Sequence, residues 1–352
     1  MKRRAAGIAL AFGVVGGLAA SGMHAQQAPA GRNFEAEIRA ALQSAKDAAG
    51  FDFTGTLARI CLLPQSGGVD TSDTVPPYIA NPALVPPREF WYAEPAKVFD
   101  NFYFVGGKVH SAWALTTKEG IILFDTIYPY NSEELIIGGM QKLGLDPKNI
   151  KYMLISHAHG DHIGGAEMMQ KRYGMRVVMG VADWDLVEKY PNRYKTMAPK
   201  RDMVATDGME ITLGEASVRT WLTPGHTPGT LSYTFTVLDR GRPVSVAYSG
   251  GTAFNFVNNT PDPGIRNFQT YIDSQRHFAA QAAAAKATVI ISNHSEFDNA
   301  VAKNRMLASR GKGPHPYELG SEAVQRYLLA MQGCARAAQL RLEQQAAQAA
   351  AK

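Results

Sequence analysis

The middle of the chain, from residue 98 to residue 190, alternates short apolar runs with stretches in which apolar residues recur at helical spacing. Turn residues separate each run from the next stretch. This alternation is typical of an α/β fold. The expected strands cover residues 102–105, 121–124, 152–155 and 176–179, and the expected helices cover residues 132–143, 164–172 and 183–190.

The next part of the chain repeats this content in a different order. Three strand-like runs cover residues 210–213, 217–222 and 230–237. A long helical stretch, 268–287, then leads into an apolar run at 288–291 that we expect to be a buried strand. A first half with strands and helices is thus followed by a second half of similar content.

The two ends of the chain have a different texture. Apolar spacing predicts a short amphipathic helix over residues 34–49. Seven prolines fall between residues 64 and 95, so we expect an extended lead-in without regular structure that wraps the domain. The tail, residues 321–352, is rich in Ala, Gln and Arg and predicts a helix that packs on the domain or presents a solvated face.

The first 25 residues have the order of a secretory signal peptide. Lys2, Arg3 and Arg4 precede an uncharged apolar stretch, and small residues follow it up to Ala25. A retained membrane anchor is the alternative, but the apolar stretch is short and rich in Gly and Ala. We therefore expect a periplasmic or secreted protein with no stable membrane insertion after the signal is removed.

Composition narrows the function classes. The chain has 352 residues, of which 45% are hydrophobic and 19% charged, a balance that excludes disorder for most of its length. The net charge of +5 falls to about +2 without the basic start, and no basic stripe interleaved with aromatic residues is present. We therefore expect a small-molecule substrate and no nucleic-acid partner; the sequence leaves the oligomeric state open.

Only two cysteines occur, Cys61 and Cys334. In an oxidising compartment they would form a disulfide that ties the N-terminal segment to the C-terminal helix. The other reading is two buried free thiols, and we favour the bridge. Neither cysteine has the spacing of a zinc knuckle.

Three histidines and an aspartate follow the expected strand 152–155, in the segment Ser156-His157-Ala158-His159-Gly160-Asp161-His162. A loop that leaves a buried strand can aim side chains two positions apart in the same direction. His157 and His159 can therefore chelate one ion while Asp161 and His162 face another. Zinc favours imidazole nitrogen and accepts carboxylate oxygen. A histidine-rich surface loop with adventitious metal binding is the alternative, and the placement after a strand argues against it.

Two further histidines follow apolar strands. His226 lies between two Pro-Gly turns in Thr223-Pro224-Gly225-His226-Thr227-Pro228-Gly229, and His294 follows the expected strand 288–291. Alone, His226 would more often be a structural residue than a ligand. Beside the first cluster, both histidines are candidate ligands.

These segments together resemble the metallo-β-lactamase superfamily, whose HxHxDH signature is matched in full from His157 to His162. The resemblance covers roughly residues 91–300. It implies a four-layer αβ/βα sandwich in which two mixed β-sheets pack face to face, helices cover both outer faces, and the metals lie at one edge. It also implies two zinc ions, the first held by His157, His159 and His226 and the second by Asp161, His162 and His294.

The resemblance is strongest to subclass B3 of the metallo-β-lactamases. Many superfamily members bridge the two metals with an aspartate on the strand after the third histidine, but residues 247–252 read Ala-Tyr-Ser-Gly-Gly-Thr and hold no acid. Residues 91–95 and 98–106 are also similar to that subclass. We therefore favour β-lactam hydrolysis, and hence antibiotic resistance, over thioester or lactone cleavage.

The chain departs from that subclass at the position of the missing acid. A serine is common there, whereas Gly250 and Gly251 fall near it here. The hydroxyls of Ser249 and Thr252, with the amide of Asn255 or Asn258, are candidate contacts to a substrate carboxylate; ordinary turn residues are the alternative. Trp91 and Tyr92 are candidates to line the cleft or merely to pack.

The family resemblance implies that a hydroxide shared by the zinc ions attacks the lactam carbonyl. Asp161 and His226 are therefore expected to be catalytic as well as ligating, and Asp161 should orient the hydroxide. The first alternative is a two-zinc hydrolase of the same fold that acts on lactones, phosphodiesters or other esters. The second is a noncatalytic periplasmic protein that binds metal or a partner. A diiron redox protein is disfavoured because its second site usually has an acidic ligand where this chain offers His162 and His294.

These assignments divide the chain into four segments. They are a signal peptide at 1–25, an N-terminal helix with the proline-rich lead-in at 26–97, a metallo-β-lactamase-like domain at 98–300, and a C-terminal helical extension at 301–352 that packs on the same domain.

Overall fold

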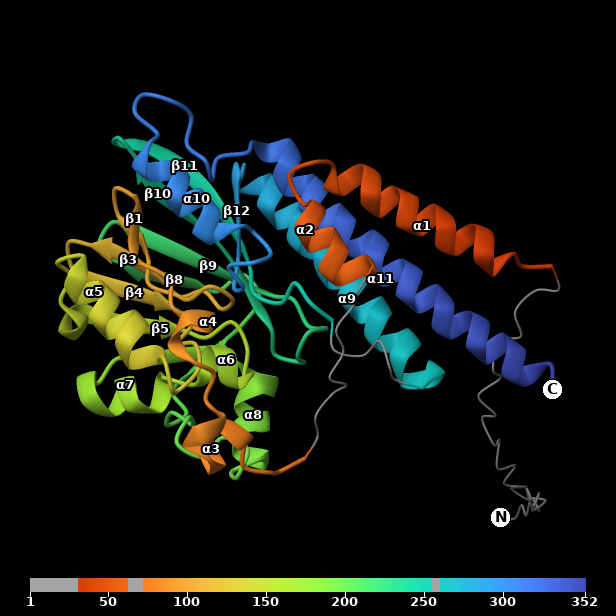
Figure 1. The fold of residues 1–352 in the computed structure, drawn as a ribbon, viewed down its shortest axis with the longest axis horizontal. Coiled ribbons are helices and arrows are strands. Elements are labelled where there is room, and N and C mark those ends of the chain that lie inside the picture. Colours follow the sequence, from red (N-terminus) through yellow and green to blue (C-terminus); the bar gives the residue numbers. More distant parts are fainter. Residues whose placement is uncertain (1–30, 63–71, 255–259) are drawn as a thin grey trace, which may run out of the picture. The chain divides into compact units, whose positions relative to one another are not determined.

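The computed structural model of the chain describes residues 31–62, 72–254 and 260–352 (Figure 1). Residues Asn33–Lys352 form one compact unit. The expected signal segment lies outside the described residues. Within the described ranges, no helix is both long enough and apolar enough to cross a membrane.

The first sheet has seven strands in the order of the sequence, β1 to β7. Strands β1 to β4 pair in antiparallel fashion, whereas β4 to β7 pair in parallel, so the sheet is mixed. The strands are β1 (Ala96–Phe99), β2 (Phe102–Phe104), β3 (Trp113–Thr117), β4 (Gly120–Phe124), β5 (Ile150–Leu154), β6 (Arg176–Gly180) and β7 (Met203–Ala205).

The second sheet has five strands in the order β12-β11-β10-β9-β8. Its pairings are antiparallel except between β11 and β12, which run in parallel. The strands are β8 (Glu210–Leu213), β9 (Ala216–Leu222), β10 (Leu231–Asp239), β11 (Arg242–Ser249) and β12 (Val289–Ser292).

The two sheets pack face to face through a buried aromatic layer. Phe124 of the first sheet lies 4.9 Å from the ring centroid of Phe235 in the second, and Phe102 lies 5.2 Å from it. Tyr248 of β11 stacks on Phe124 as well. All four rings are at most 5% exposed. Burial of large side chains in this layer accounts for much of the apolar surface removed from water.

Helices on the outer face of the first sheet cover a second core. Ile136, Met140, Met169 and Trp184 point from these helices onto the sheet and are fully buried. The helices are the π-helical turn η3 (Glu133–Gly138), α5 (Gly139–Lys142), α7 (Ala166–Tyr173) and α8 (Val181–Lys189). The expected helices 132–143 and 183–190 agree with this layer within a few residues, and the short helix α6 (Gly160–Ile163) precedes α7.

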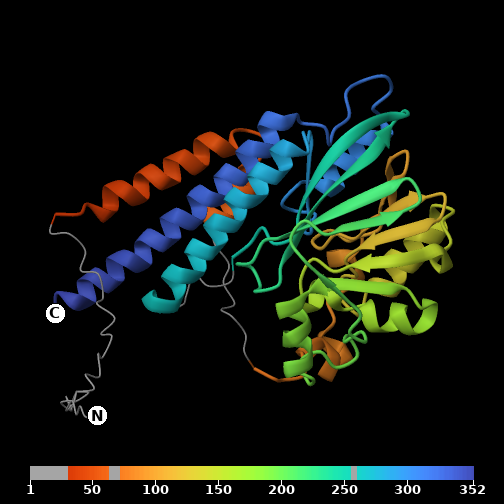
Figure 2. The ribbon, with the colours of Figure 1, turned by 180° about the vertical axis from the view of Figure 1, so that it is seen from behind.

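The long helices α9 (Pro261–Ala284) and α11 (Ser321–Ala350) cover the outer face of the second sheet, and a third long helix, α1 (Phe34–Ala49), packs against α11. The helix α11 lies against both α9 and α1, as Figures 1 and 2 show from opposite sides. A third core joins these helices to β11 and β12 through Ala247 and Ile290. The expected four-layer sandwich of two mixed sheets between helices is therefore confirmed.

A disulfide ties the two ends of the described chain together. Cys61, in the π-helical turn η1 (Ala58–Leu62) that follows α2 (Thr54–Leu57), is bonded to Cys334 of α11, with 4.8 Å between their Cα atoms. Of the two readings of the cysteines, the bridge is the one that the structure contains.

The proline-rich lead-in differs from the extended segment that its composition predicts. Three single helical turns occur in it, α3 (Pro77–Ala80), η2 (Pro82–Leu84) and α4 (Arg88–Trp91), so the expected absence of regular structure is wrong for these residues. Proline fixes φ near the helical value and lacks only a hydrogen-bond donor that the first turn leaves unused, so it begins a turn well. Residues 63–71 lie outside the described part.

Several elements were not expected from the hydrophobic pattern. They are β1, β3, β7, β11, α2, the π-helical turn η1, the 3₁₀ turn η4 (Pro147–Asn149), α6 and α10 (Ala300–Ala308). The helix expected at 268–287 begins earlier, at Pro261. Proline suits the first helical position because its φ is already near the helical value.

Candidate metal centre

The candidate ligands lie on loops that leave the strands of both sheets. His157 and His159 follow β5, and Asp161 and His162 lie in the short helix α6 that comes next. His226 lies between β9 and β10, and His294 follows β12. The main-chain amide of Leu231 donates to the carbonyl of Ser156 at 2.8 Å, which fastens the loop of the first sheet to that of the second. The structure thus brings all six predicted ligands together.

His157, His159 and His226 form the first group, in which one ligand atom from each residue lies within 4.8 Å of the others. Nδ1 of His159 is 3.0 Å from Nε2 of His226. Ligand atoms about 2 Å from a tetrahedral zinc ion are separated by about 3.3 Å. The nitrogens therefore have the spacing of ligands to one ion.

Hydrogen bonds to main-chain carbonyls set the tautomers of this group. Nδ1 of His157 donates to the carbonyl of Gly250 at 2.9 Å, and Nδ1 of His226 donates to that of Ala253 at 2.6 Å. Because a carbonyl only accepts, each Nε2 carries a lone pair. Nε2 of His157 is buried and has no hydrogen-bond partner. A buried acceptor without a donor fits a metal ligand, since it otherwise carries the cost of desolvation.

Asp161, His162 and His294 form the second group. Oδ2 of Asp161 is 3.2 Å from Nε2 of His162 and 3.4 Å from Nε2 of His294. The two imidazole nitrogens are 3.2 Å apart. One carboxylate oxygen and two imidazole nitrogens at this spacing match the ligand chemistry of a second zinc ion.

Asp125 orients His162 of the second group through a contact with Nδ1, the ring nitrogen that faces away from Asp161. It follows β4 in the left-handed backbone region, with φ of 56°, a conformation that aspartate adopts more readily than most residues. Its Oδ2 lies 3.0 Å from Nδ1 of His162 and also accepts from the hydroxyls of Ser156 and Tyr248. The sequence analysis missed this residue; its only signal is an acid directly after a buried strand.

Burial keeps most of the imidazoles neutral. It lowers the pKa of His157 and His226 well below the ordinary value and lowers that of His159 to about 4. Burial would raise the pKa of Asp161, but His162 and its neighbours hold that pKa well below the usual range. Burial would lower the pKa of His162 as well, but Asp161 and Asp125 raise it to about 10. The first group therefore presents nitrogen lone pairs, and Asp161 of the second presents an ionised carboxylate, as metal binding requires.

A second buried carboxylate joins the loops that carry the first group. Asp183 of α8 accepts from the main-chain amides of Ala158 and Gly229, both at 2.8 Å, and from the hydroxyl of Thr227 at 2.7 Å. Burial raises the pKa of Asp183 to about 6. This residue fixes the distance between the loop of His157 and the loop of His226.

Gly250 and Gly251, which follow β11, have no room for a side chain. A Cβ atom on Gly250 would overlap the carbonyl oxygen of Leu231, and one on Gly251 would lie 2.7 Å from Cβ of His226. Glycine is therefore a steric requirement of the close approach of these loops. No carboxylate occurs in residues 247–252.

The expected substrate contacts lie in different environments. Ser249 and Thr252 are each 1% exposed. Their hydroxyls are 3.2 Å apart, and that of Thr252 also contacts Ser292 and Tyr327 of α11. These contacts favour the structural alternative for both hydroxyls, and their contact with substrate stays a prediction. Asn255 and Asn258 lie outside the described residues.

Trp91 and Tyr92 of the lead-in pack against neighbours. Nε1 of Trp91 donates to the carbonyl of Pro86 at 3.0 Å, and the guanidinium of Arg88 lies 3.5 Å above the ring of Tyr92. The Trp91 ring also lies 6.4 Å from that of Tyr130. These contacts favour packing.

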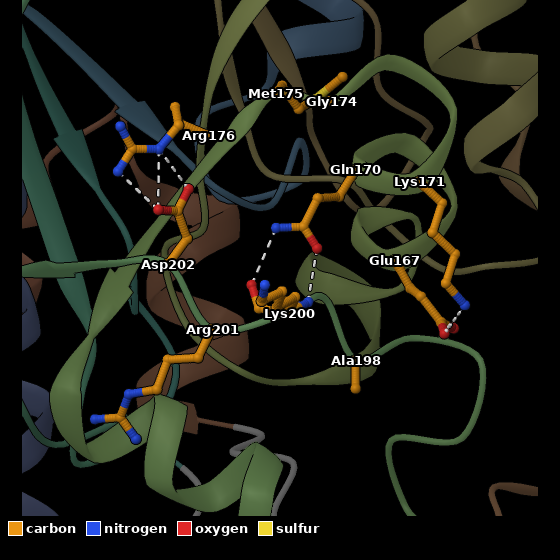
Figure 3. A pocket seen from close by; sticks show the side chains of 10 residues that line it. All are labelled: Glu167, Gln170, Lys171, Gly174, Met175, Arg176, Ala198, Lys200, Arg201 and Asp202. Atoms are coloured by element: carbon orange, nitrogen blue, oxygen red, sulfur yellow. Dashed lines mark hydrogen bonds and ion pairs between the residues drawn. The ribbon is translucent and has the colours of Figure 1, made fainter.

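A surface pocket of about 620 Å³ lies away from these loops, beside α7 and β6 (Figure 3). Its charged side chains are largely paired: Arg176 binds Asp202 through two nitrogens, and Lys171 binds Glu167. The amide of Gln170 closes a pair of hydrogen bonds with the main chain of Lys200. Because these groups satisfy one another, the pocket offers little charge to a ligand.

Residues 105–240 match the family model described as the metallo-β-lactamase superfamily. This part of the chain is therefore a metallo-β-lactamase superfamily domain. The matched range contains His157, His159, Asp161, His162 and His226, whereas His294 follows it. The predicted family membership is thus confirmed, and the protein is a hydrolase of the superfamily.

Solved structures of subclass B3 metallo-β-lactamases resemble this superfamily member. BJP-1 of Bradyrhizobium japonicum is 28% identical with a TM-score of 0.59, and the match covers 74% of this chain and 96% of BJP-1. Native FEZ-1 of Legionella gormanii has a TM-score of 0.60 at 21% identity, covering 73% of this chain and 97% of FEZ-1, which is a likeness of fold.

Curated relatives carry broader names. The probable metallo-hydrolase YybB of Bacillus subtilis (strain 168) is 27% identical over 53% of this chain and 81% of its own length. A hydroxyacylglutathione hydrolase of Acidiphilium cryptum (strain JF-5) is 34% identical, but over only 24% of this chain and 31% of its own length.

Proposed function

We propose that this chain is a two-zinc hydrolase that opens the amide bond of β-lactam antibiotics. The observation that carries the proposal is the two adjoining groups of ligand atoms, with His157, His159 and His226 in one and Asp161, His162 and His294 in the other. The likeness to subclass B3 enzymes along nearly their whole length supports the substrate class.

The ions would supply the nucleophile and the electrophile, because zinc lowers the pKa of bound water to about 7 and polarises a carbonyl group. The residues of the chain would position them. His157 and His226 are oriented by the carbonyls of Gly250 and Ala253, and His162 is oriented by Asp125. Asp161 would bind the second ion through Oδ2 and orient the attacking water toward the substrate carbonyl.

The absence of an acidic residue in 247–252 favours β-lactams over thioesters and lactones as substrates. Residues 247–252 offer no bridging carboxylate, and the backbone contacts of Gly250 leave no space for one. Thioester and lactone hydrolases of this fold commonly have that bridge. A second candidate, hydrolysis of a thioester or another ester, is supported by the partial match to hydroxyacylglutathione hydrolases.

Steady-state hydrolysis separates these candidates. The purified chain is assayed with a penicillin, a cephalosporin and a carbapenem, and with a panel of thioester, lactone and phosphodiester substrates. We expect β-lactam turnover that a chelator abolishes and zinc restores. Turnover of the ester panel alone would support the second candidate, and no metal-dependent turnover of either set would leave only a binding role.

Asp161→Ala tests the assignment of the carboxylate. We expect kcat to fall at least about a hundredfold, because the variant loses both a ligand and the group that orients water. Metal content is measured alongside the rate. A variant that holds two ions and turns over at the wild-type rate would remove the proposed role of Asp161.

We also propose that the protein is exported to the periplasm or secreted. The Cys61–Cys334 disulfide supports this location, because disulfides persist in oxidising compartments. The division into a signal peptide, a lead-in, a domain at 98–300 and a helical extension at 301–352 is part of the same proposal. Mass spectrometry of the protein recovered from a periplasmic fraction tests whether residues 1–25 have been removed.

A further inference from the structure

A seventh side chain reaches the candidate metal centre from a loop that the sequence analysis did not consider. His110 lies between β2 and β3, and its Nε2 is 3.3 Å from Oδ2 of Asp161. Ligand atoms of His110, Asp161 and His294 lie within 4.8 Å of one another. Nε2 of His110 is thus as close to the carboxylate of Asp161 as Nε2 of His162 and of His294.

The main chain holds His110 rigidly against the loop that carries His294. The two residues form an antiparallel bridge. On either side of it, the amide of Ser111 donates to the carbonyl of Asn293 at 2.9 Å, and the amide of Ser295 donates to that of Val109 at 2.8 Å. The imidazole of His110 also packs edge to face on that of His294, with 4.8 Å between the ring centroids.

Three imidazole nitrogens therefore surround one carboxylate oxygen. Nε2 of His110, His162 and His294 lie 3.3, 3.2 and 3.4 Å from Oδ2 of Asp161. Ligand atoms about 2 Å from a tetrahedral zinc ion are separated by about 3.3 Å, and these three distances agree with that spacing. Nδ1 of His162 donates to Asp125, so Nε2 of the neutral imidazole faces Oδ2 of Asp161 with a lone pair. A cation bound between these atoms would remove the repulsion between their lone pairs.

We infer that His110 is a fourth protein ligand of the second metal ion, beside Asp161, His162 and His294. This inference rests on the proposed two-metal centre. A zinc ion with four protein ligands has a closed coordination shell, whereas catalytic sites keep a position open. The second ion would then hold the site together, and the first group would keep the open position for the substrate.

The alternative is that His110 only donates a hydrogen bond to Asp161. Counting the metal-bound imidazoles separates the two roles. The full chain is loaded with two equivalents of Co²⁺, and the solvent-exchangeable imidazole N–H signals shifted by the metal are counted by proton NMR. Each bound histidine contributes one such signal. We expect six signals, one each from His110, His157, His159, His162, His226 and His294.

Substitutions assign the additional signal. His110→Ala and His110→Gln are each expected to lose one signal and to weaken binding of the second ion at least about tenfold, measured by competition with a chromogenic chelator. His277→Ala removes a histidine that pairs with Asp207 elsewhere on the surface, and is expected to keep all signals and the affinity.

The outcomes are distinct. Two bound ions with five signals in the wild-type chain would overturn the role of His110 and leave the proposed function intact, and this count needs no variant. Two bound ions and an unchanged spectrum in the His110 variants would do the same. Fewer than two bound ions in the wild-type chain would overturn both the inference and the proposed function.

Discussion

At the scale of single residues, the orientation of His157, His162 and His226 is fixed by a hydrogen bond from the ring nitrogen that faces away from the candidate metal centre. His157 and His226 donate to main-chain carbonyls, which move only with the backbone. His162 instead faces the buried carboxylate of Asp125, which also accepts hydrogen bonds from the hydroxyls of Ser156 and Tyr248. Of these three ligands, His162 is therefore the one whose support a single side-chain substitution removes.

Asp125→Asn tests this support. The amide keeps the volume but loses the charge that stabilises a metal-bound imidazole, so we expect the second ion to bind about 10-fold to 100-fold more weakly. Competition with a chromogenic chelator measures the two affinities. Asp146→Asn, at the start of η4, serves as the control. Equal affinities in wild type and Asp125→Asn would show that the contact does not act on the metal.

A buried ion pair far from the centre predicts a pH-dependent stability. Asp239 accepts from both terminal nitrogens of Arg310, at 2.7 and 2.8 Å, and this contact lowers its pKa. Asp239→Asn is expected to reduce the free energy of unfolding by about 2 kcal/mol at pH 7, between the values for exposed and fully buried pairs.

The sign of the pH effect follows from the direction of the shift. Because the folded carboxyl has the lower pKa, its contribution is complete above pH ~4 and is lost as the pH falls through the folded value. Urea unfolding at pH 7 and pH 3 should therefore show a smaller difference between wild type and variant at pH 3. A difference that is constant with pH would mean that the ion pair does not carry the effect.

Adjacency along the chain decided which site residues could be predicted. His157, His159, Asp161 and His162 fall within six positions after one strand, so their pattern is visible in the sequence. His110 and Asp125 are single residues in other loops. The approach of His110 depends on the pairing of its loop with that of His294, which no local pattern encodes.

At the scale of elements, the strength of the periodic pattern decided which helices and strands could be predicted from the sequence. The helix α1 and the strand β8 have the predicted bounds, because each shows a sustained apolar period. By contrast, β7 has three residues that are defined by pairing with β6, and the turns α3 and α4 are too short to show a period. Tertiary contacts therefore fix the elements that the sequence left out.

The contact between α1 and α11 depends on one glycine. A Cβ on Gly333 would lie 2.9 Å from Cβ of Ala45 and 3.1 Å from the carbonyl oxygen of Ala41. Gly333→Val should push the helices apart and lower the free energy of unfolding by about 1–3 kcal/mol, although glycine itself is a poor helix former.

Chemical denaturation with the disulfide intact measures this effect. Gln345→Val, at an exposed position of the same helix, is the matched control and is expected to change the stability by less than about 0.5 kcal/mol. A Gly333→Val protein as stable as wild type would show that α1 and α11 tolerate a wider separation.

At the scale of the whole molecule, the candidate metal centre lies where loops of the two sheets meet. Its candidate ligands come from loops of the first sheet, which carries His157 to His162, and of the second, which carries His226 and His294. The aromatic layer between the sheets and the hydrogen bond between Ser156 and Leu231 hold these loops together. Bound metal would therefore stabilise an arrangement that packing also favours.

Removal of metal should consequently loosen the loops and leave the helical layer intact. An ion at a free concentration a hundredfold above its Kd adds about 2.7 kcal/mol to folding, so zinc is expected to raise Tm by about 5 °C or more over chelator-treated protein. Magnesium, which prefers oxygen ligands, should have little effect.

Hydrogen exchange should accelerate on chelation in residues 156–162, 223–230 and 292–295, whereas α1 and α11, joined through Cys61 and Cys334, should exchange as before. Equal Tm values with zinc and with chelator, or faster exchange spread evenly over the helices, would contradict a centre formed where the loops of the two sheets meet.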